Sequence, residues 1–533
     1  MVNAQRMTAV GSAYLDDRLF IDLAASISHG DWLGTYSART LAKGPAYSIF
    51  IAFTHALHVP LPVAQQLLYA GACAAFAYAI APLFRLRFLP VLLFAVILFN
   101  PMSFETQVMG RVLRQHLATP ATLLALASGC GLWFFVRRNY YLRLGWALIG
   151  GIALAACWLS REEAILIFPA AFILAAGGLW AHRHSWRRPP TWLLFALPWL
   201  ILALACSTVS LLNKKHYQAA ITGEFHSQEF AAAYGALTRV RASDWQPYVP
   251  VTREMRERIY AVSPAFAQLR HYFDGDAGRN WASYGSGLTG RPAEEREIAG
   301  GWFMWALRDA VEETGHATNA KQALAYYRQL ADEVNAACDQ GRLDALPARS
   351  GFVPPWNPAY RKPWIDAVGT AVHFMISFDQ FNARAEPSSG DEESLALFKE
   401  YTGAKLSPLR ELPRDYTVLE RARLRGLDFI AQIYQKNYSW LFWAGIAATL
   451  AVFVFGNRKQ QIILLSVQAA LAGTVLLSIA AVAFIHVSSF PAIITGYFHG
   501  SYPLALCFTM LGLIGFAELM VCRSRNLHGL DVS

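Results

Sequence analysis

Long apolar segments recur along this chain, and this feature limits its fold more than any other. A window of about 19 residues detects about nine segments, each close to the length that crosses the apolar core of a bilayer. They cover residues 62–84, 88–104, 117–136, 144–160, 164–181, 191–212, 438–456, 461–485 and 502–521. The composition agrees, with 55% hydrophobic and 16% charged residues. The sequence therefore predicts an α-helical polytopic membrane protein.

Basic residues in the short connecting loops predict its orientation, because Lys and Arg mark the cytoplasmic side. In a nine-span arrangement they fall on one face: Arg85, Arg87, Arg137, Arg138, Arg143, Arg183, Arg187, Arg188, Arg458, Lys459, Arg523 and Arg525. The opposite, exterior face then receives the first 61 residues and the stretch 213–437. Short loops and the lack of retention signals favour a multi-pass protein of a bacterial inner (plasma) membrane.

The pattern divides the chain into five parts. Residues 1–61 are an exterior N-terminal loop with a short interfacial helix near 46–59, and residues 62–212 are transmembrane. Residues 213–437 form an exterior, mostly helical soluble domain, residues 438–521 return to the membrane, and residues 522–533 are a cytoplasmic tail. Nothing before Asp16 resembles an anchor. We therefore expect either a tenth helix upstream of residue 1 or an N-terminal tail that translocates unaided.

The net charge of +9 does not indicate nucleic acid as a partner. Residues 213–437 carry nearly equal numbers of basic and acidic side chains, so the excess belongs to the membrane segments and follows from their orientation. No Gly-rich phosphate loop is present, which disfavours direct use of a nucleotide. Six of the seven cysteines lie in or beside apolar segments, and Cys338 alone lies in the exterior stretch. This distribution predicts neither a disulfide framework nor a structural zinc site.

An acidic pair, Asp16 and Asp17, stands just outside the membrane and opens a polar, Gly-punctuated stretch that ends at Tyr47. Carboxylates, His, Arg and Lys gathered against a bilayer indicate a site for a charged lipid head group. A simpler interpretation of Asp17 is that it caps the helix that begins near Arg18. Likewise, Lys43 suits an interfacial side chain whose amine reaches water.

Several short motifs resemble those of the GT-C membrane glycosyltransferases, of the dolichyl-phosphate-mannose and aminoarabinose transferase type. The motifs are the acidic pair, Gly30-Asp-Trp-Leu-Gly34, Lys43-Gly-Pro-Ala-Tyr47, Val112-Leu-Arg-Gln115, Ser160-Arg-Glu-Glu163 and His499-Gly-Ser-Tyr-Pro503. The resemblance covers residues 14–212 well and the C-terminal segments loosely. Two departures are visible: the pair is Asp-Asp where protein mannosyltransferases tend to have Asp-Glu, and Ser501 stands where an Arg-Tyr-Pro element would have Arg.

The resemblance implies an inverting transferase that takes a sugar from a polyprenyl-phosphate donor and passes it to a lipid, glycan or protein acceptor on the exterior face. Asp16 or Asp17 would be the base that deprotonates the acceptor hydroxyl. Five cations are candidates for the lipid phosphate, with Lys43 matching the family best: Lys43, Arg18, Arg111, Arg114 and Arg161. Some relatives use a divalent metal, for which Glu105 beside the acidic pair is the candidate ligand.

Simpler roles and other functions stay open. Arg111 and Arg114 could end a span at the interface, Arg161 could pair with Glu162 or Glu163, and the aromatic run Trp302–Trp305 suits the core of the exterior domain. A flippase or exporter of a lipid-linked intermediate would need charges inside several spans, whereas the ionisable residues here gather at one face. A non-enzymatic envelope assembly protein is the third hypothesis.

Overall fold

The structure is a computed structural model, and it describes most of the chain. The described ranges are 6–135, 140–181, 183, 189–289, 292, 295–410, 416–456 and 458–527. Arg137, Arg138, Arg187 and Arg188, which entered the orientation argument, lie outside them, as do residues 528–533 of the tail. Helices dominate the described part, where β-type pairing is confined to three isolated bridges.

Eight helices in the described part are long and apolar enough to cross a membrane. They are α3 (Leu61–Ile80), α6 (Gln115–Phe134), α7 (Tyr140–Trp158), α8 (Phe168–Ala181), α9 (Pro189–Tyr217), α20 (Val418–Phe455), α21 (Arg458–Ser488) and α23 (Ser501–Leu527). The span of α8 includes the 3-10 helix that precedes it and runs from Glu163 to Ala181. The polytopic membrane class predicted from the sequence is confirmed, and each helix overlaps a predicted span.

The remaining predicted span, 88–104, is bent. Helix α4 (Leu89–Leu98) is followed by a 3-10 turn (Pro101–Ser103) and by α5 (Thr106–Met109), and the two halves meet at 58°. The break falls at Asn100-Pro101, where proline lacks an N–H and forces the preceding residue into an extended conformation. The count of spans is therefore eight, or nine if the bent pair is one span.

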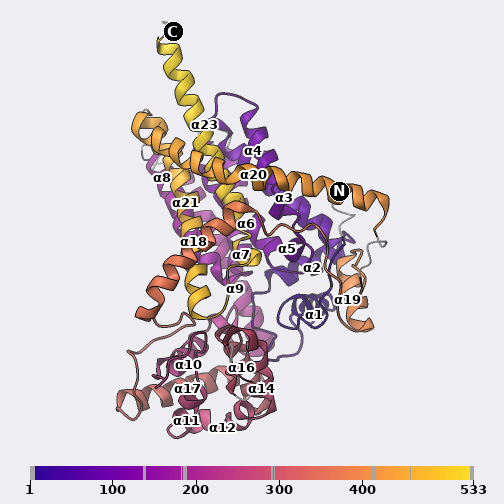
Figure 1. The fold of residues 1–533 in the computed structure, drawn as a ribbon, viewed down its shortest axis with the longest axis vertical. Helices are drawn as coiled ribbons and strands as arrows, with labels where there is room; N and C mark the ends of the chain where they lie inside the picture. Colours follow the sequence, from indigo (N-terminus) through magenta and orange to yellow (C-terminus); the bar gives the residue numbers. More distant parts are fainter. Residues whose placement is uncertain are drawn as a thin grey trace.

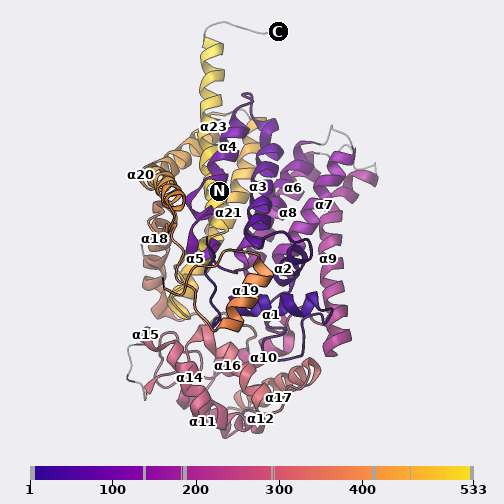
Figure 2. The same ribbon diagram turned by 90° about the vertical axis from the view of Figure 1, so that its right-hand side faces the viewer.

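The spans pack into one bundle. Helix α6 contacts α3, α7 and α8, while α23 contacts α20 and α21, and α21 closes the bundle against α8. The bundle core is apolar and includes Phe76, Leu126, Trp133 and Leu471. Small residues allow close approach, as in membrane helix pairs generally: a Cβ on Gly131 would fall 2.4 Å from the Trp146 ring. Helix α20 is strongly inclined to the long axis of the molecule (Figures 1 and 2).

A separate group of helices, which we call the lobe, lies at one end of the bundle (Figures 1 and 2). It comprises α10 (Gln228–Arg239), α11 (Arg253–Tyr260), α12 (Pro264–Gln268), α13 (Arg270–Asp274), α14 (Asp276–Tyr284), α15 (Ser286–Thr289), α16 (Gly300–Glu313) and α17 (Ala320–Asp339). Figure 2 shows the α3–α4 turn and the end of α23 at the opposite end. The lobe thus lies on the side that the basic loops predict to be exterior.

The lobe has its own apolar core because its helices are amphipathic. Helix α17 starts at Asn319, whose side chain accepts from Gln322 N at 3.0 Å, and it buries apolar residues at helical spacing. Helix α16 buries Phe303 and Trp305, so these two members of the predicted aromatic run belong to the lobe core.

The chain beyond the lobe returns to the bundle. Helix α18 (Arg361–Ser377) packs on α20 and α21, and α19 (Glu392–Thr402) packs on the N-terminal helices α1 (Asp17–Ser28) and α2 (Ala46–Ala56). Helix α2 is the short apolar helix expected at the interface. The five-part division at residues 61, 212, 437 and 521 stays a prediction.

Candidate functional site

The acidic pair lies where the lobe, the bundle and the N-terminal helices meet, because α1 runs between the lobe and the bundle (Figures 1 and 2). Asp16 immediately precedes α1 and Asp17 is its first residue; the Asp16 side chain makes no helix-capping bond. The loop after α1 turns back through Gly34, whose φ of +81° belongs to the left-handed region. This turn returns Lys43 to the start of α1.

Asp16 pairs with Lys43. The Lys43 Nζ donates to Asp16 Oδ1 and to the carbonyl of Leu15, and it lies 5.2 Å from the Phe20 ring centre and 5.6 Å from that of Trp305. The Lys43 side chain is only 9% exposed, whereas that of Asp16 is 51% exposed. Lys43 is therefore held in place by aromatic and carboxylate partners, and it is not an extended interfacial side chain.

Asp17 is fully buried and pairs with Arg111. The guanidinium donates to both carboxylate oxygens, at 3.1 Å from Nε and 2.5 Å from Nη2, and Val112 N donates at 3.2 Å. Both oxygens are thus occupied inside the protein. Asp17 fixes the segment that carries Arg111 and cannot reach a substrate hydroxyl in this arrangement.

The two neighbours differ in pKa. Desolvation acts to raise the pKa of Asp16, but Lys43, Arg114 and Arg111 outweigh it and hold the pKa below the ordinary value. For Asp17, desolvation is the larger effect, and its pKa is raised in spite of Arg111. Asp16 is consequently the carboxylate that stays ionised and reaches solvent.

Two further arginines approach from the bundle. Arg114, at the start of α6, donates to the carbonyl of Ser160 at 2.6 Å. Arg161 pairs through two bonds, at 2.7 and 3.0 Å, with Glu163 and donates to the carbonyl of Gly496 at 3.3 Å. Of the two predicted partners of Arg161, Glu163 is the one it contacts; the Glu162 side chain lies outside the described part.

Tyr497 links these arginines to the acidic pair. It belongs to α22 (Thr495–Phe498), and Arg161 lies 5.9 Å from its ring centre. Burial, followed by the charge of Glu163, raises the pKa of Tyr497 to about 12, while Arg161 and Arg114 oppose this shift. The phenol therefore stays protonated. The charge of Asp16 also acts to raise the pKa of this phenol. We call Lys43, Arg111, Arg114 and Arg161 the cation cluster.

Two predicted site residues lie elsewhere. Arg18 donates to Asp22 at 2.6 Å and to Ser394 Oγ at 2.5 Å, which directs it towards α19. Glu105 is buried and caps α5, where its carboxylate accepts from Gln107 N at 2.7 Å and Val108 N at 3.0 Å.

The carboxylates present do not fit a divalent metal. Backbone amides occupy the oxygens of Glu105, Arg111 occupies both oxygens of Asp17, and Lys43 pairs with Oδ1 of Asp16. Within the described ranges, no group of three or more His, Cys, Asp or Glu is arranged to hold a metal ion. We derive no step through one.

A cavity of about 100 Å³ opens below Arg161, Glu163 and Tyr497, between α6, α7, α21 and α23. We call it the bundle cavity. Several hydroxyl groups line it, but Thr474 and Ser478 donate to carbonyls one turn earlier in their own helix, at 2.9 Å each. The wall is otherwise largely apolar, including Ile167 and Leu504. The cavity thus joins an apolar interior to the cation cluster.

The lobe holds the loop that carries Lys43. Buried Arg308 donates to Glu224 Oε2 at 2.8 Å and to the carbonyl of Ala38, and Glu224 N donates to the carbonyl of Leu41 at 2.8 Å. Tyr36 also donates to Glu224. A charged pair in the lobe core therefore fixes residues 36–41 just ahead of Lys43.

Sequence reasoning missed Tyr497 and Gly496 as parts of the site. The only signal was their position: Gly496-Tyr497 directly precedes the His499–Pro503 motif. His499 itself is buried, with its ring nitrogens 2.9 Å from Thr119 Oγ1 and 2.9 Å from the carbonyl of Met102. His499 therefore supports the segment that carries Tyr497 from the interior of the protein.

Neither a family model nor a curated protein sequence matches this chain. Among solved structures, the chain is similar to the crystal structure of ArnT from Cupriavidus metallidurans in the apo state. The likeness covers 97% of this chain and 74% of that chain, at 12% sequence identity and a TM-score of 0.30. At this identity and TM-score it assigns no role to any residue, so the chemistry rests on the geometry above.

Proposed function

We propose that this protein is an inverting membrane glycosyltransferase that moves a sugar from a polyprenyl-phosphate donor to an acceptor at the lobe end of the bundle. The supporting observation is the half-exposed Asp16 carboxylate among the cation cluster, beside an apolar cavity. An anionic head group on a long apolar chain matches these two environments. With the lobe on the exterior side, transfer would take place at the outer face of a bacterial inner membrane.

The cation cluster would receive the donor phosphate. Breaking the anomeric C–O bond leaves the electron pair on the phosphate oxygen, so preorganised cations stabilise the charge that develops. Arg114 and Arg161 offer planar donor groups and Lys43 a compact point charge. The phosphate-proximal end of the polyprenyl chain would enter the bundle cavity.

Asp16 would be the base. The acceptor hydroxyl attacks the anomeric carbon from the face opposite the phosphate, its proton passes to Asp16, and the polyprenyl phosphate departs. Binding of the phosphate to Lys43 weakens the Lys43–Asp16 pair and thereby raises the pKa of Asp16, which makes the carboxylate a stronger base. Asp17 would act indirectly, by holding Arg111.

The test is transfer in proteoliposomes from a panel of radiolabelled polyprenyl-phosphate sugars. Asp16→Asn should abolish transfer, because the amide cannot accept the proton. Asp22→Asn is the matched control: Asp22 lies on the same helix and is 45% exposed, but it pairs with Arg18 away from the cluster. Full activity of Asp16→Asn, or no transfer by the wild type from any donor, would refute the proposal.

A further inference from the structure

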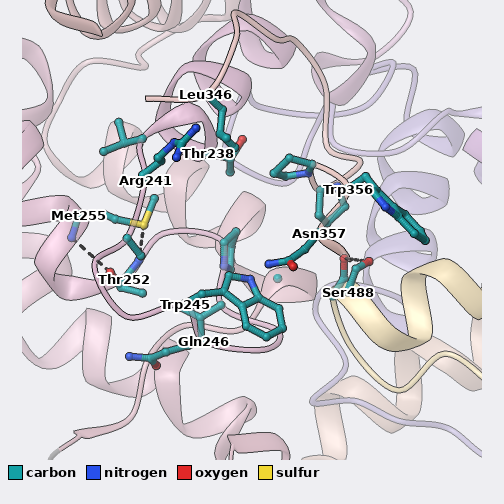
Figure 3. Close-up of a pocket in the computed structure, with 18 of the residues that line it drawn as sticks. Thr238, Arg241, Trp245, Gln246, Thr252, Met255, Leu346, Trp356, Asn357 and Ser488 are labelled. Carbon is teal, nitrogen blue, oxygen red and sulfur yellow. Dashed lines mark hydrogen bonds between the residues drawn. The ribbon is translucent and has the colours of Figure 1, made fainter. Parts of the chain in front are cut away.

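A second cavity, of about 330 Å³, lies where the lobe meets the end of α21. We call it the junction cleft. Its wall combines the loop after α10, the start of α16, the segment 346–360 and the last residues of α21 (Figure 3). It shares no lining residue with the bundle cavity and none with the cation cluster.

Aromatic rings from two segments line the junction cleft. Trp356 stacks on Phe484 of α21, with ring centres 5.9 Å apart and an interplanar angle of 17°, and Tyr360 joins it to Trp245 at 6.2 and 5.5 Å. Trp245 and Trp356 nevertheless stay 43% and 55% exposed. The rings are thus fixed by neighbours while much of their surface is left uncovered.

Neutral amides supply the polar groups. Asn357 accepts from Ala359 N at 2.9 Å, which fixes its oxygen and leaves its NH₂ group without a hydrogen bond to any described residue. Figure 3 shows Asn357 between Trp245 and Trp356. The Oε1 atom of Gln246 is buried and has no hydrogen-bond partner in the described part of the chain. The NH₂ group of Asn357 is therefore a donor available beside the rings, whereas the buried Gln246 Oε1 atom is not accessible from the cleft.

The frame of the junction cleft is stiff. Tyr248 has a φ of +66°, a conformation that L residues rarely adopt, and its carbonyl accepts from Gly300 N at 2.8 Å. A Cβ on Gly300 would lie 3.2 Å from the carbonyl oxygen of Ser489, so lobe and bundle are in direct contact here. Pro354, Pro355 and Pro358 restrict the opposite wall.

The low charge of the junction cleft limits the class of ligand that it can bind. Arg241 is the only charged side chain among the described lining residues, and its Nε lies 3.7 Å from Asp344 Oδ1. A phosphorylated or strongly anionic ligand would find no cluster of cations. A neutral sugar matches the junction cleft. Its C–H groups would pack on the flat aromatic faces, its hydroxyl groups would bond to an amide, and the volume lies near the lower end of the range for small-molecule pockets.

We propose that the junction cleft binds a neutral saccharide, with a sugar ring on Trp356 or Trp245 and a hydroxyl group on the Asn357 NH₂ group. The saccharide could be carried by a soluble glycan or by a glycolipid head group, because the cleft adjoins the end of a span. Its use as the acceptor site rests on the proposed transferase function; binding itself does not. The competing role of these rings is an aromatic belt that anchors the protein at the membrane interface.

Binding is measured on the full chain in nanodiscs. In one arm, saturation-transfer NMR screens maltohexaose, cellohexaose, mannohexaose and chitohexaose. In the other arm, native mass spectrometry follows digalactosyldiacylglycerol added to the nanodiscs. We expect at least one sugar to bind, with affinity at least fivefold lower in Trp356→Ala and Asn357→Ala. Trp440→Ala, which removes a 79% exposed indole from α20, should bind as the wild type does.

The outcomes separate the two roles and the two proposals. Binding in either arm that weakens in the two cleft variants supports the saccharide site, and the responding arm identifies its source. No binding in either arm, or unchanged binding in both cleft variants, overturns it. Trp356→Phe, which keeps an aromatic ring, should bind the saccharide more tightly than Trp356→Ala does. Asp16→Asn should bind the saccharide as the wild type does, because Asp16 lies outside the junction cleft. A wild type that binds the saccharide but transfers no sugar would refute the proposed transferase function and leave the saccharide site standing.

Discussion

Asp16 and Asp17 are adjacent in the sequence but have different surroundings. The side chain of Asp16 is half-exposed and faces Lys43, whereas that of Asp17 is sealed against Arg111. The start of a helix produces this difference, because successive side chains there point in different directions. We therefore propose that Asp16 takes part in the chemistry, whereas Asp17 supports the structure.

Alanine at each position should separate these roles. Asp17→Ala leaves Arg111 without its carboxylate partner and should lower the free energy of unfolding by about 3–5 kcal/mol. Asp16→Ala removes a carboxylate partner of the nearly buried Lys43, but because Asp16 itself is half-exposed this change should lower the free energy of unfolding by less than Asp17→Ala does. Thermal unfolding in nanodiscs measures both changes. A larger loss from Asp16→Ala than from Asp17→Ala would contradict the assigned surroundings.

The pH dependence of transfer should follow Asp16. Its lowered pKa in the free protein keeps it ionised, so kcat/KM should stay level from pH 7 down to pH 5 and fall only in stronger acid. Once the donor phosphate binds Lys43, the pKa of Asp16 rises, and the acid limb of kcat should lie at higher pH than that of kcat/KM. Initial rates across pH give both limbs. A kcat/KM that already declines between pH 7 and pH 5 would argue against Asp16 as the base.

At the scale of elements, the turn Lys43-Gly44-Pro45 depends on contact with the end of α7. A Cβ on Gly44 would fall 2.1 Å from the carbonyl oxygen of Leu159, and Ala46 N donates to that same carbonyl at 3.1 Å. Only glycine permits this approach. The glycine of the motif is thus explained by backbone packing, and the lysine by its contact with Asp16.

Gly44→Ala should therefore displace the turn. Overpacking against backbone should lower the free energy of unfolding by about 1–3 kcal/mol or more, and transfer should fall because Lys43 moves. Gly71→Ala is the control, since Gly71 lies in α3 with no atom within 4 Å of its added Cβ; it should be neutral or slightly stabilising. Thermal unfolding and transfer assays check both variants. Equal behaviour of the two would refute the contact.

The lobe should affect transfer through the Arg308–Glu224 pair. Arg308→Met leaves Glu224 buried without its cation and should lower the free energy of unfolding by about 3–5 kcal/mol. Adding Glu224→Gln should recover part of this loss, because the two residues act together. A double-mutant cycle by thermal unfolding measures the coupling. Additive losses would mean that the pair does not hold the 36–41 loop.

Over the whole molecule, the sequence predicted the spans because hydropathy is local. The sequence also predicted that Lys43 and the acidic pair lie on the same side of the membrane. The inclination of α20 and the return of α18 to the bundle depend on packing between distant segments, which no local pattern records. The same limit applies to the site: Arg161 meets Gly496 across 335 positions, and Arg18 is drawn away by Ser394 across 376.

The central claim is that different residues of one site bind the donor and accept the proton. A binding measurement tests this claim most directly. Native mass spectrometry of the protein in nanodiscs gives the affinity for a polyprenyl-phosphate sugar, alongside transfer by the same samples. We predict that Asp16→Asn binds the donor at least as tightly as the wild type but does not transfer the sugar, and that Arg161→Met binds it at least tenfold more weakly. Loss of donor binding in Asp16→Asn, or unchanged binding in Arg161→Met, would contradict the account.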